Sequence, residues 1–213
     1  MVRVHETNIT PPFNGQRPVK IKNICVYCGS SPGKNPAYSL AAKALATALC
    51  ERNIGLVYGG AAVGVMGTIA NAVLEAGGEA VGVIPKSLAV KEVAHESLTQ
   101  LHVVASMHER KAMMADLSDG FIALPGGWGT LEEIFEILTW AQLGFHDKPC
   151  ALLNIEGYYD QLIAFLESSF QQQFVNELCR PMLIEARDPG MLLDQFATYR
   201  APSVRKWVGE DEL

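Results

Sequence analysis

The sequence predicts a doubly wound α/β domain, in which helices cover both faces of a mostly parallel sheet. From about residue 20 onward, short apolar runs alternate with longer segments of helical pattern. The runs are apolar on both sides, as strands are when helices bury both faces of a parallel sheet. Glycine-rich turns follow three of the runs, and such turns are typical of the connection between a strand and the next helix. Together these observations indicate a Rossmann-like sheet.

Six strands are expected where four or five consecutive residues are mostly apolar. The runs are ICVY, GLVY, AVGVI, LHVVA, FIAL and ALLNI, at residues 24–27, 55–58, 80–84, 101–105, 121–124 and 151–155. Five helices are expected where apolar residues recur with helical spacing, at residues 37–52, 66–76, 107–118, 130–143 and 158–170. Each of these helices follows a strand, which favours parallel neighbours rather than hairpins.

The length and composition fit one large domain. The chain has 213 residues, of which 49% are hydrophobic and 19% are charged, enough apolar material for a sizeable core. We expect this domain at residues 21–200, after a disordered segment at 1–20 and before a polar tail at 201–213. The formal net charge of −6 argues against a nucleic-acid partner, because binding a phosphate backbone needs clustered lysine and arginine.

Targeting and redox features favour the cytoplasm. The first 20 residues lack the apolar core of a signal peptide, and no stretch reaches the roughly 18 apolar residues of a membrane span. The five cysteines are odd in number and scattered, so no disulfide framework is expected. Cys25 and Cys28 form a C-x-x-C pair, but residues three apart in a strand point to opposite faces, so neither a metal site nor a redox pair is expected.

The three glycine-rich turns, at residues 28–33, 59–67 and 125–130, are candidate ligand contacts. In the first two turns we expect the contacts at Gly29, Ser30, Gly59 and Gly60. Glycine lets the backbone approach a ligand closely, and the N-terminus of the next helix attracts phosphate. Any one turn is as well explained as a tight connection, but three at one sheet edge favour a phosphate cradle. None contains G-x-G-x-x-G or the P-loop pattern, which argues against hydride transfer with NAD and against ATP hydrolysis.

Charged residues begin the helices beside these turns. Arg110 and Lys111 lie in the helix after the fourth strand, where the alternative to ligand binding is a solvated helix face. Glu133 shares a helix face with Thr130, so T-x-x-E is explained either as a capping box or as a functional carboxylate. In the functional interpretation the helix dipole holds Glu133 ionised, which suits stabilising a developing cation or activating water. Carboxylates are the usual partners of the cation formed when a glycosidic bond breaks, and an arginine would hold the phosphate or the departing base.

The segment from Pro125 to Glu133 matches the P-G-G-x-G-T-x-x-E signature of the LONELY GUY family of cytokinin riboside 5′-monophosphate phosphoribohydrolases. The segment from Met107 to Lys111 matches the arginine–lysine motif that precedes this signature. The resemblance continues through TWAQLG and HDKP at residues 139–149 and spans roughly residues 22–200.

This resemblance implies a hydrolase without metal or cofactor that splits the N-glycosidic bond of a purine nucleoside 5′-monophosphate, cytokinin or adenine, releasing the base and ribose 5-phosphate. It implies that Arg110 and Glu133 are the catalytic pair and that the protein is a homodimer. The residues that would contact substrate are Glu92, Lys111, Gly126, Gly127, Trp128, Gly129, Thr130, Leu131, Glu132 and Thr139. The base preference and the role of residues 171–188, in the base pocket or as an extension of the sheet, stay open.

Two other functions are weighed against hydrolysis. Proteins of this family are also labelled possible lysine decarboxylases, but that chemistry generally needs pyridoxal phosphate on a Schiff-base lysine, and Lys111 is the only lysine within the two motifs. A module that senses a nucleotide without cleaving it is the second alternative. The presence of both Arg110 and Glu133 favours the enzyme, because sensing an anionic ligand has little need of a carboxylate beside it.

Overall fold

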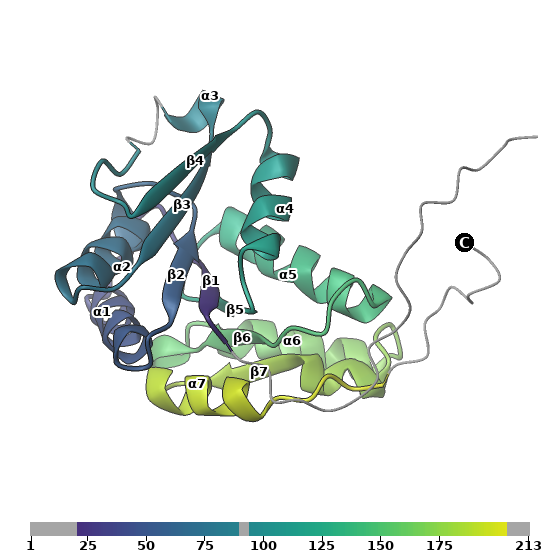
Figure 1. Cartoon of the computed structure of the whole chain (residues 1–213). Coiled ribbons are helices and arrows are strands. Elements are labelled where there is room, and N and C mark those ends of the chain that lie inside the picture. The colour runs from purple at the N-terminus through teal and green to yellow at the C-terminus, as the bar shows by residue number, and fades with distance from the viewer. Residues whose placement is uncertain (1–20, 90–93, 204–213) are drawn as a thin grey trace, which may run out of the picture.

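The computed structural model describes residues 21–89 and 94–203 (Figure 1). Seven strands form one sheet in the order β4-β3-β2-β1-β5-β6-β7, and every neighbouring pair is parallel. The strands are β1 (Asn23–Tyr27), β2 (Gly55–Tyr58), β3 (Ala80–Pro85), β4 (Gln100–Val104), β5 (Gly120–Ala123), β6 (Cys150–Leu153) and β7 (Leu183–Ala186). The predicted α/β class and all six predicted strands are confirmed, with ends that differ by up to two residues. The segments predicted as a disordered start and a polar tail lie wholly or mostly outside the described residues.

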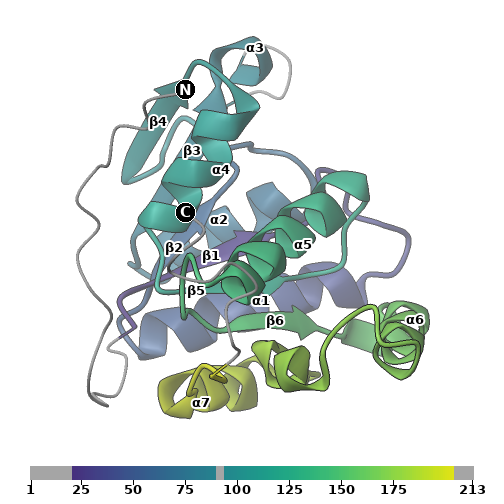
Figure 2. The ribbon, with the colours of Figure 1, turned by 90° about the vertical axis from the view of Figure 1, so that its right-hand side faces the viewer.

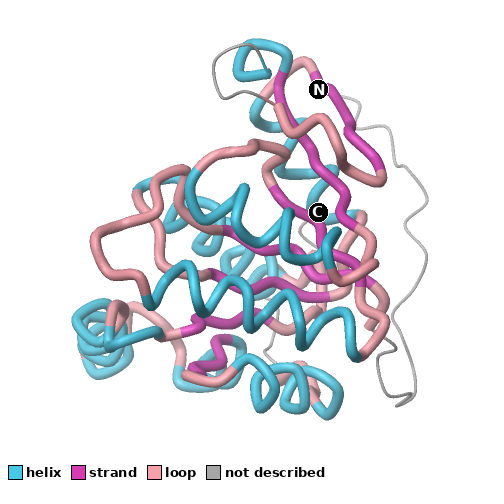
Figure 3. Tube along the Cα trace, turned by 90° about the vertical axis from the view of Figure 1, so that its left-hand side faces the viewer, coloured by secondary structure: helices cyan, strands magenta, loops and turns pink. Residues whose placement is uncertain are grey.

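Helices cover both faces of this sheet. They are α1 (Ala37–Glu51), α2 (Gly64–Glu75), α3 (Lys86–Ala89), α4 (Met107–Asp116), α5 (Trp128–Leu143), α6 (Asp160–Gln171) and α7 (Pro189–Thr198), with short 3₁₀ helices η1 (Ile155–Gly157) and η2 (Glu177–Met182). In Figure 2, α4 and α5 lie in front of the sheet while α1 and α2 lie behind it. Figure 3, from the opposite side, shows helices of the second layer in front of the strands. Within the described ranges, no helix is both long and apolar enough to cross a membrane.

Two cores, one on each face, follow from the alternation of side chains along the strands. In β1, Ile24 and Val26 pack with α1, α2 and α7, whereas Cys25 packs with α4 and α5 on the other face. Cys28 belongs to the first core and Cys25 to the second, as predicted for residues three apart in a strand. Both cysteines are buried thiols without a disulfide.

The C-terminal segment contains elements that the sequence pattern did not predict. Strand β7 pairs with β6 in parallel, so residues 171–188 do extend the sheet, and α7 packs its buried Phe196 into the first core. In the β7 run, LIEA, Leu183 and Ile184 are half-buried and Glu185 is exposed, and the preceding η2 contains Pro181. Without a long apolar run, neither element stood out in the sequence.

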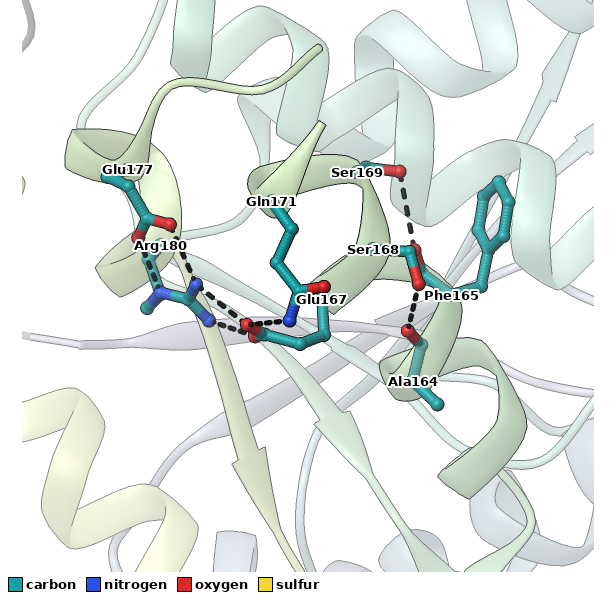
Figure 4. A network of polar contacts seen from close by, with 8 residues as sticks. All are labelled: Ala164, Phe165, Glu167, Ser168, Ser169, Gln171, Glu177 and Arg180. Carbon is teal, nitrogen blue, oxygen red and sulfur yellow. Dashed lines mark hydrogen bonds and ion pairs between the residues drawn. The ribbon is translucent and has the colours of Figure 1, made fainter. Parts of the chain in front are cut away.

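Helix η2 is held against α6 by Arg180. Its guanidinium pairs with Glu167 of α6 and with Glu177 of η2 itself, as Figure 4 shows. It also lies 4.3 Å from the centre of the Phe170 ring, a cation–π distance. All of these groups are exposed or half-buried, so the network joins two surface elements and contributes little to the cores.

Candidate active site

The three predicted glycine turns meet at the carboxyl edge of the sheet. The Gly29 amide donates to the carbonyl of Pro125 at 3.3 Å, and the Val65 amide donates to the carbonyl of Gly29 at 3.0 Å. These contacts join the turns that follow β1, β2 and β5, and so gather segments that are far apart in the sequence. This is the sheet edge at which ligands bind in doubly wound folds.

A cavity of about 330 Å³ opens between these turns and the starts of α4 and α5. Its lining residues come from the β1 turn, α2, α4 and the β5–α5 turn, and they are Cys28, Gly29, Ser30, Met66, Arg110, Gly127, Trp128, Gly129, Thr130 and Glu133. A neighbouring cavity of about 270 Å³ shares Gly29, Ser30 and Gly127 with it and is also lined by Tyr38 and Tyr158. The structure therefore brings the two predicted catalytic side chains, Arg110 and Glu133, to one cavity.

Arg110 is 6% exposed and is not on a solvated helix face. Its Nε donates to the carbonyl of Val83 at 3.1 Å, and its Nη2 donates to the carbonyl of Gly59 at 3.0 Å. Val83 lies within β3 and Gly59 directly follows β2, so the guanidinium is fixed to two neighbouring strands. A buried charge needs such partners, because an unpaired one costs several kcal/mol.

The start of α4 is fixed by a reciprocal cap. Ser106 Oγ accepts from the Glu109 amide at 3.1 Å, and Glu109 Oε2 accepts from the Ala105 amide at 2.8 Å. This arrangement satisfies amides that the helix cannot pair internally. It fixes the first turn of α4, and with it the point from which the side chain of Arg110, the residue after Glu109, extends.

The predicted capping box at Thr130 and Glu133 does not form. Helix α5 begins at Trp128, its N-cap is Gly127, and no side chain caps it. Thr130 lies inside the first turn and is buried, where it fills the space above Gly126: a Cβ on that glycine would come within 2.1 Å of Thr130 Oγ1. The predicted cap, Thr130, lies three residues after the actual N-cap, Gly127, and Glu133 is left free of a capping role.

Glu133 is 9% exposed, and its protonation state differs from the sequence-based expectation. Burial raises the pKa of its carboxyl from 4.5 to about 7, although the nearby charge of Arg110 opposes this rise. Glu132 and Glu136 raise the pKa further, and Lys111 lowers it. The sequence-based expectation was a carboxyl held ionised, whereas burial raises its pKa so that part of the group is protonated at neutral pH. A carboxyl with a pKa near neutrality suits proton transfer.

Gly59 and Gly60 are buried, and neither is among the described residues that line the two cavities. A Cβ on Gly59 would lie 2.1 Å from Nη2 of Arg110. Gly60 has a φ of +79° and accepts a hydrogen bond from the His95 amide at 3.0 Å. Gly59 leaves room for the arginine, and Gly60 provides a left-handed turn. Their predicted contact with substrate stays a prediction.

Lys111 and Thr139 point away from the cavity. The Lys111 amino group pairs with Glu132 and with Glu136, the latter at 3.0 Å. Thr139 Oγ1 donates to the carbonyl of Phe135 at 2.7 Å, and Thr139 lines a separate apolar cavity of about 190 Å³ beside η2. Neither residue lines the cavity that contains Arg110 and Glu133, and their predicted substrate contacts stay predictions.

The remaining predicted contacts lie near the turn, with one exception. Trp128 is 90% exposed at the start of α5, Leu131 is half-buried and packs against the α4–α5 core, and Glu92 lies outside the described residues. The sequence did not single out Met66, which lines the cavity from α2, or Tyr158, whose hydroxyl donates to the carbonyl of Gly126 at 2.6 Å. Cys28 was recognisable by its place directly after β1, but Tyr158 carries no such signal. No group of three or more metal-ligating residues occurs in the described part of the chain.

Comparisons with known proteins relate the whole domain to one family. A family model described as possible lysine decarboxylase matches residues 66–196. Cytokinin riboside 5′-monophosphate phosphoribohydrolase LOG1 from Arabidopsis thaliana is 48% identical over 196 residues, 90% of this chain and 92% of that protein. Probable cytokinin riboside 5′-monophosphate phosphoribohydrolase LOGL6 from Oryza sativa subsp. japonica is 47% identical over 180 residues, 84% of this chain and 72% of that protein.

A solved structure, the molybdenum cofactor binding protein from the phototrophic bacterium Rippkaea orientalis, has a TM-score of 0.62 at 22% identity. The match covers 83% of this chain and 96% of that one. At this level of identity the likeness shows that the two proteins share a fold.

Replacing Glu133 by glutamine should stabilise the protein at high pH. Because the pKa is raised to about 7 in the folded state, wild type loses stability as pH rises from about 4.5 to 7, and a glutamine does not ionise. We expect Glu133→Gln to gain up to about 3 kcal/mol in the free energy of unfolding at pH 8 and almost nothing at pH 4. Urea denaturation at both pH values measures this.

Glu75→Gln, at the exposed end of α2, is the control and should show no such gain. A Glu133→Gln protein that is less stable than wild type at pH 8 would contradict the assigned burial effect.

Proposed function

We propose a hydrolytic function from one premise: the chain belongs to the family of cytokinin riboside 5′-monophosphate phosphoribohydrolases. It hydrolyses the N-glycosidic bond of a purine nucleoside 5′-monophosphate and releases the free base and ribose 5-phosphate. The observation that carries this proposal is that Arg110 and Glu133, both buried, line one cavity at the N-terminus of α5. The substrate is a cytokinin riboside monophosphate or AMP.

The N-terminus of α5 is proposed to bind the phosphate. A helix start offers free amides and a positive dipole to an anion. Gly127 and Gly129 are exposed, and a Cβ on either would have no atom within 4 Å. Packing within the chain therefore does not require glycine at these two positions, and close approach of a ligand to the backbone explains both.

Glu133 acts on the ribose. As a carboxylate it stabilises the positive charge that develops at the anomeric carbon when the glycosidic bond breaks, and it orients the attacking water and accepts its proton. A pKa of about 7 leaves a large share of the group ionised at neutral pH and still able to accept that proton. Arg110, with Nε and Nη2 bonded to carbonyls, presents a fixed positive charge to the phosphate or to the departing base.

The decarboxylase label of the family model finds little support in the geometry. Burial alone would lower the pKa of Lys111, but hydrogen bonds to Glu132 and Glu136 raise it above its ordinary value. A protonated, ion-paired amine is a poor nucleophile for a Schiff base. A nucleotide-sensing module remains the second candidate, and it predicts ligand-dependent stabilisation without turnover.

The chain is proposed to act as a homodimer in the cytoplasm, on a small molecule and not on nucleic acid. Large apolar side chains are exposed on α6, η2 and the nearby loops: Phe145 at 74%, Phe165 at 67%, Phe174 at 87% and Leu178 at 55%. Exposed apolar patches are typical of subunit interfaces, and we assign these four side chains to one. The described cysteines are free thiols, which fits a reducing compartment.

Incubation with AMP or isopentenyladenosine monophosphate should release free base. Arg110→Ala and Glu133→Ala should each lower kcat/KM by about 100-fold or more, the loss typical of a removed electrostatic or acid–base group. Chromatography of base and ribose 5-phosphate measures the reaction. Arg52→Ala, which removes an ion pair with Asp194 on the surface, should keep wild-type activity. Stabilisation of wild type by the nucleotide without any base release would favour the sensing module instead.

Gly59→Ala should impair activity through Arg110. The new Cβ needs the space that Nη2 occupies, so the guanidinium must move while the backbone stays. We expect kcat/KM to fall at least about tenfold, since small misplacements of a reacting group are costly, and the melting temperature to fall as well, because the displaced guanidinium loses its bond to the Gly59 carbonyl. Gly127→Ala tests the proposed phosphate contact instead of the arginine position: it should weaken phosphate binding and so raise KM. Wild-type kcat/KM in Gly59→Ala would show that the arginine position is unimportant.

The homodimer is tested by light scattering. The full chain should give twice the chain mass, and Phe165→Asp together with Phe174→Asp should shift it toward the monomer, because charges at an apolar interface are costly. Leu40→Asp, at an exposed position of α1, should leave the mass unchanged. A monomeric wild type would contradict this assembly.

A further inference from the structure

The amino group of Lys111 is held between two carboxylates of another helix. It donates to Glu132 Oε1 and, at 3.0 Å, to Glu136 Oε1, residues that lie 21 and 25 positions away in the sequence. The lysine side chain is 8% exposed, whereas those of Glu132 and Glu136 are 53% and 25% exposed. The three groups therefore form a partly buried link between α4 and α5, and partly buried pairs are screened less by water and salt than surface pairs.

This link lies directly beside the proposed catalytic pair. Arg110 and Lys111 are neighbours on α4, and Glu132 and Glu133 are neighbours on α5. Successive residues of a helix point about 100° apart. On each helix, one residue of the two faces the cavity while the other faces the opposite helix.

We propose that Lys111 is a positioning residue: its ion pairs to Glu132 and Glu136 fix the start of α5 against α4 and so hold Glu133 at the cavity that Arg110 lines. This inference rests on the proposed function. It assigns to Lys111 a role between the helices, in place of the substrate contact that the family resemblance implies. To reach a phosphate in the cavity, the lysine would have to leave both carboxylates.

The charges around Glu133 give this role a consequence for the reaction. Near it are Arg110 and Lys111 from α4, and Glu132 and Glu136 from its own helix. Strand β1 and the turn after it add three groups that are uncharged at neutral pH, Cys25, Tyr27 and Cys28. Arg110 and Lys111 lower the pKa of Glu133, and the two glutamates raise it. Removing Lys111 would leave two uncompensated carboxylates near a buried third, so Glu133 would ionise only at higher pH.

The test compares Lys111→Met and Lys111→Arg with wild type in the base-release assay with AMP, as full-length proteins. For Lys111→Met we expect kcat to fall at least about tenfold and KM to change less than about threefold, the pattern of a disturbed reacting group rather than of lost binding. The ascending limb of kcat/KM against pH should move to higher pH. Lys111→Arg, which can keep both ion pairs, should restore most of kcat.

Lys148→Met is the matched control. Lys148 also contacts α4: its Nζ donates to the carbonyl of Ala115, near the C-terminus of that helix, at 2.9 Å. The Lys148→Met variant should leave kcat and the pH limb unchanged. Glu136→Gln leaves the ion pair between Lys111 and Glu132 in place and removes one negative charge near Glu133, so it should move the pH limb to lower pH. Opposite shifts in Lys111→Met and Glu136→Gln are not expected from a general loss of stability, and Glu136→Gln decides the matter if Lys111→Met does not fold.

A rise of KM with kcat unchanged in Lys111→Met, together with weaker inhibition by ribose 5-phosphate, would overturn the proposal and show direct contact with substrate. An unshifted pH limb in both Lys111→Met and Glu136→Gln would overturn it as well. Failure of the proposed function is distinct from both, because wild type itself would then release no base.

Discussion

The buried guanidinium of Arg110 is the interaction on which the geometry of the site depends. A charge that is 6% exposed persists only where polar partners replace water, and here the carbonyls of Val83 and Gly59 do so. One carbonyl lies within β3 and the other directly follows β2, its parallel neighbour, so the arginine joins β2 and β3 to α4. The absence of a side chain at Gly59 leaves room for the guanidinium, and the cap at Ser106 fixes the first turn of α4, from which the arginine extends.

Glu133 lies at the same cavity, and burial is the main cause of its raised pKa. The chain as a whole carries a net charge of −6, which argues against a polyanionic partner. At the cavity, however, the balance is local: Arg110 and Lys111 stand near three glutamates of α5, and the amides of that helix add positive potential that no charge count includes. This local balance is compatible with the proposed binding of a single nucleotide by a chain of net negative charge.

The sequence predicted the fold wherever one local rule was sufficient. Apolar runs located six strands, and the rule that ligands bind at the carboxyl edge brought the three glycine turns together correctly. Strand β7 and helix α7 were missed because LIEA is only partly buried and takes its place in the sheet from pairing with β6 rather than from its own composition. The capping box at Thr130 was wrong because the tight packing of Thr130 on Gly126 starts the helix earlier than its T-x-x-E pattern indicates.

Within the site, the motif identified Arg110 and Glu133, but contacts between elements decided the other residues. Lys111 looked like a phosphate ligand beside Arg110, yet its partners are Glu132 and Glu136, a pairing that depends on how two helices pack. Thr139 lies on α5 beside an apolar cavity, and Tyr158 reaches Gly126 from the segment that follows the neighbouring strand β6. Such relations are properties of the packed molecule, so spacing along the chain carries no signal of them.

The most direct test of this account is a carbon-13 NMR titration of the Glu133 carboxyl in the free protein, assigned with Glu133→Gln. The account predicts an apparent pKa of about 7 and a higher value in Arg110→Gln, because the arginine charge favours the ionised form. A pKa near 4.5, or one that does not change when Arg110 is replaced, would contradict the claim that a buried arginine–carboxylate pair forms the reactive centre.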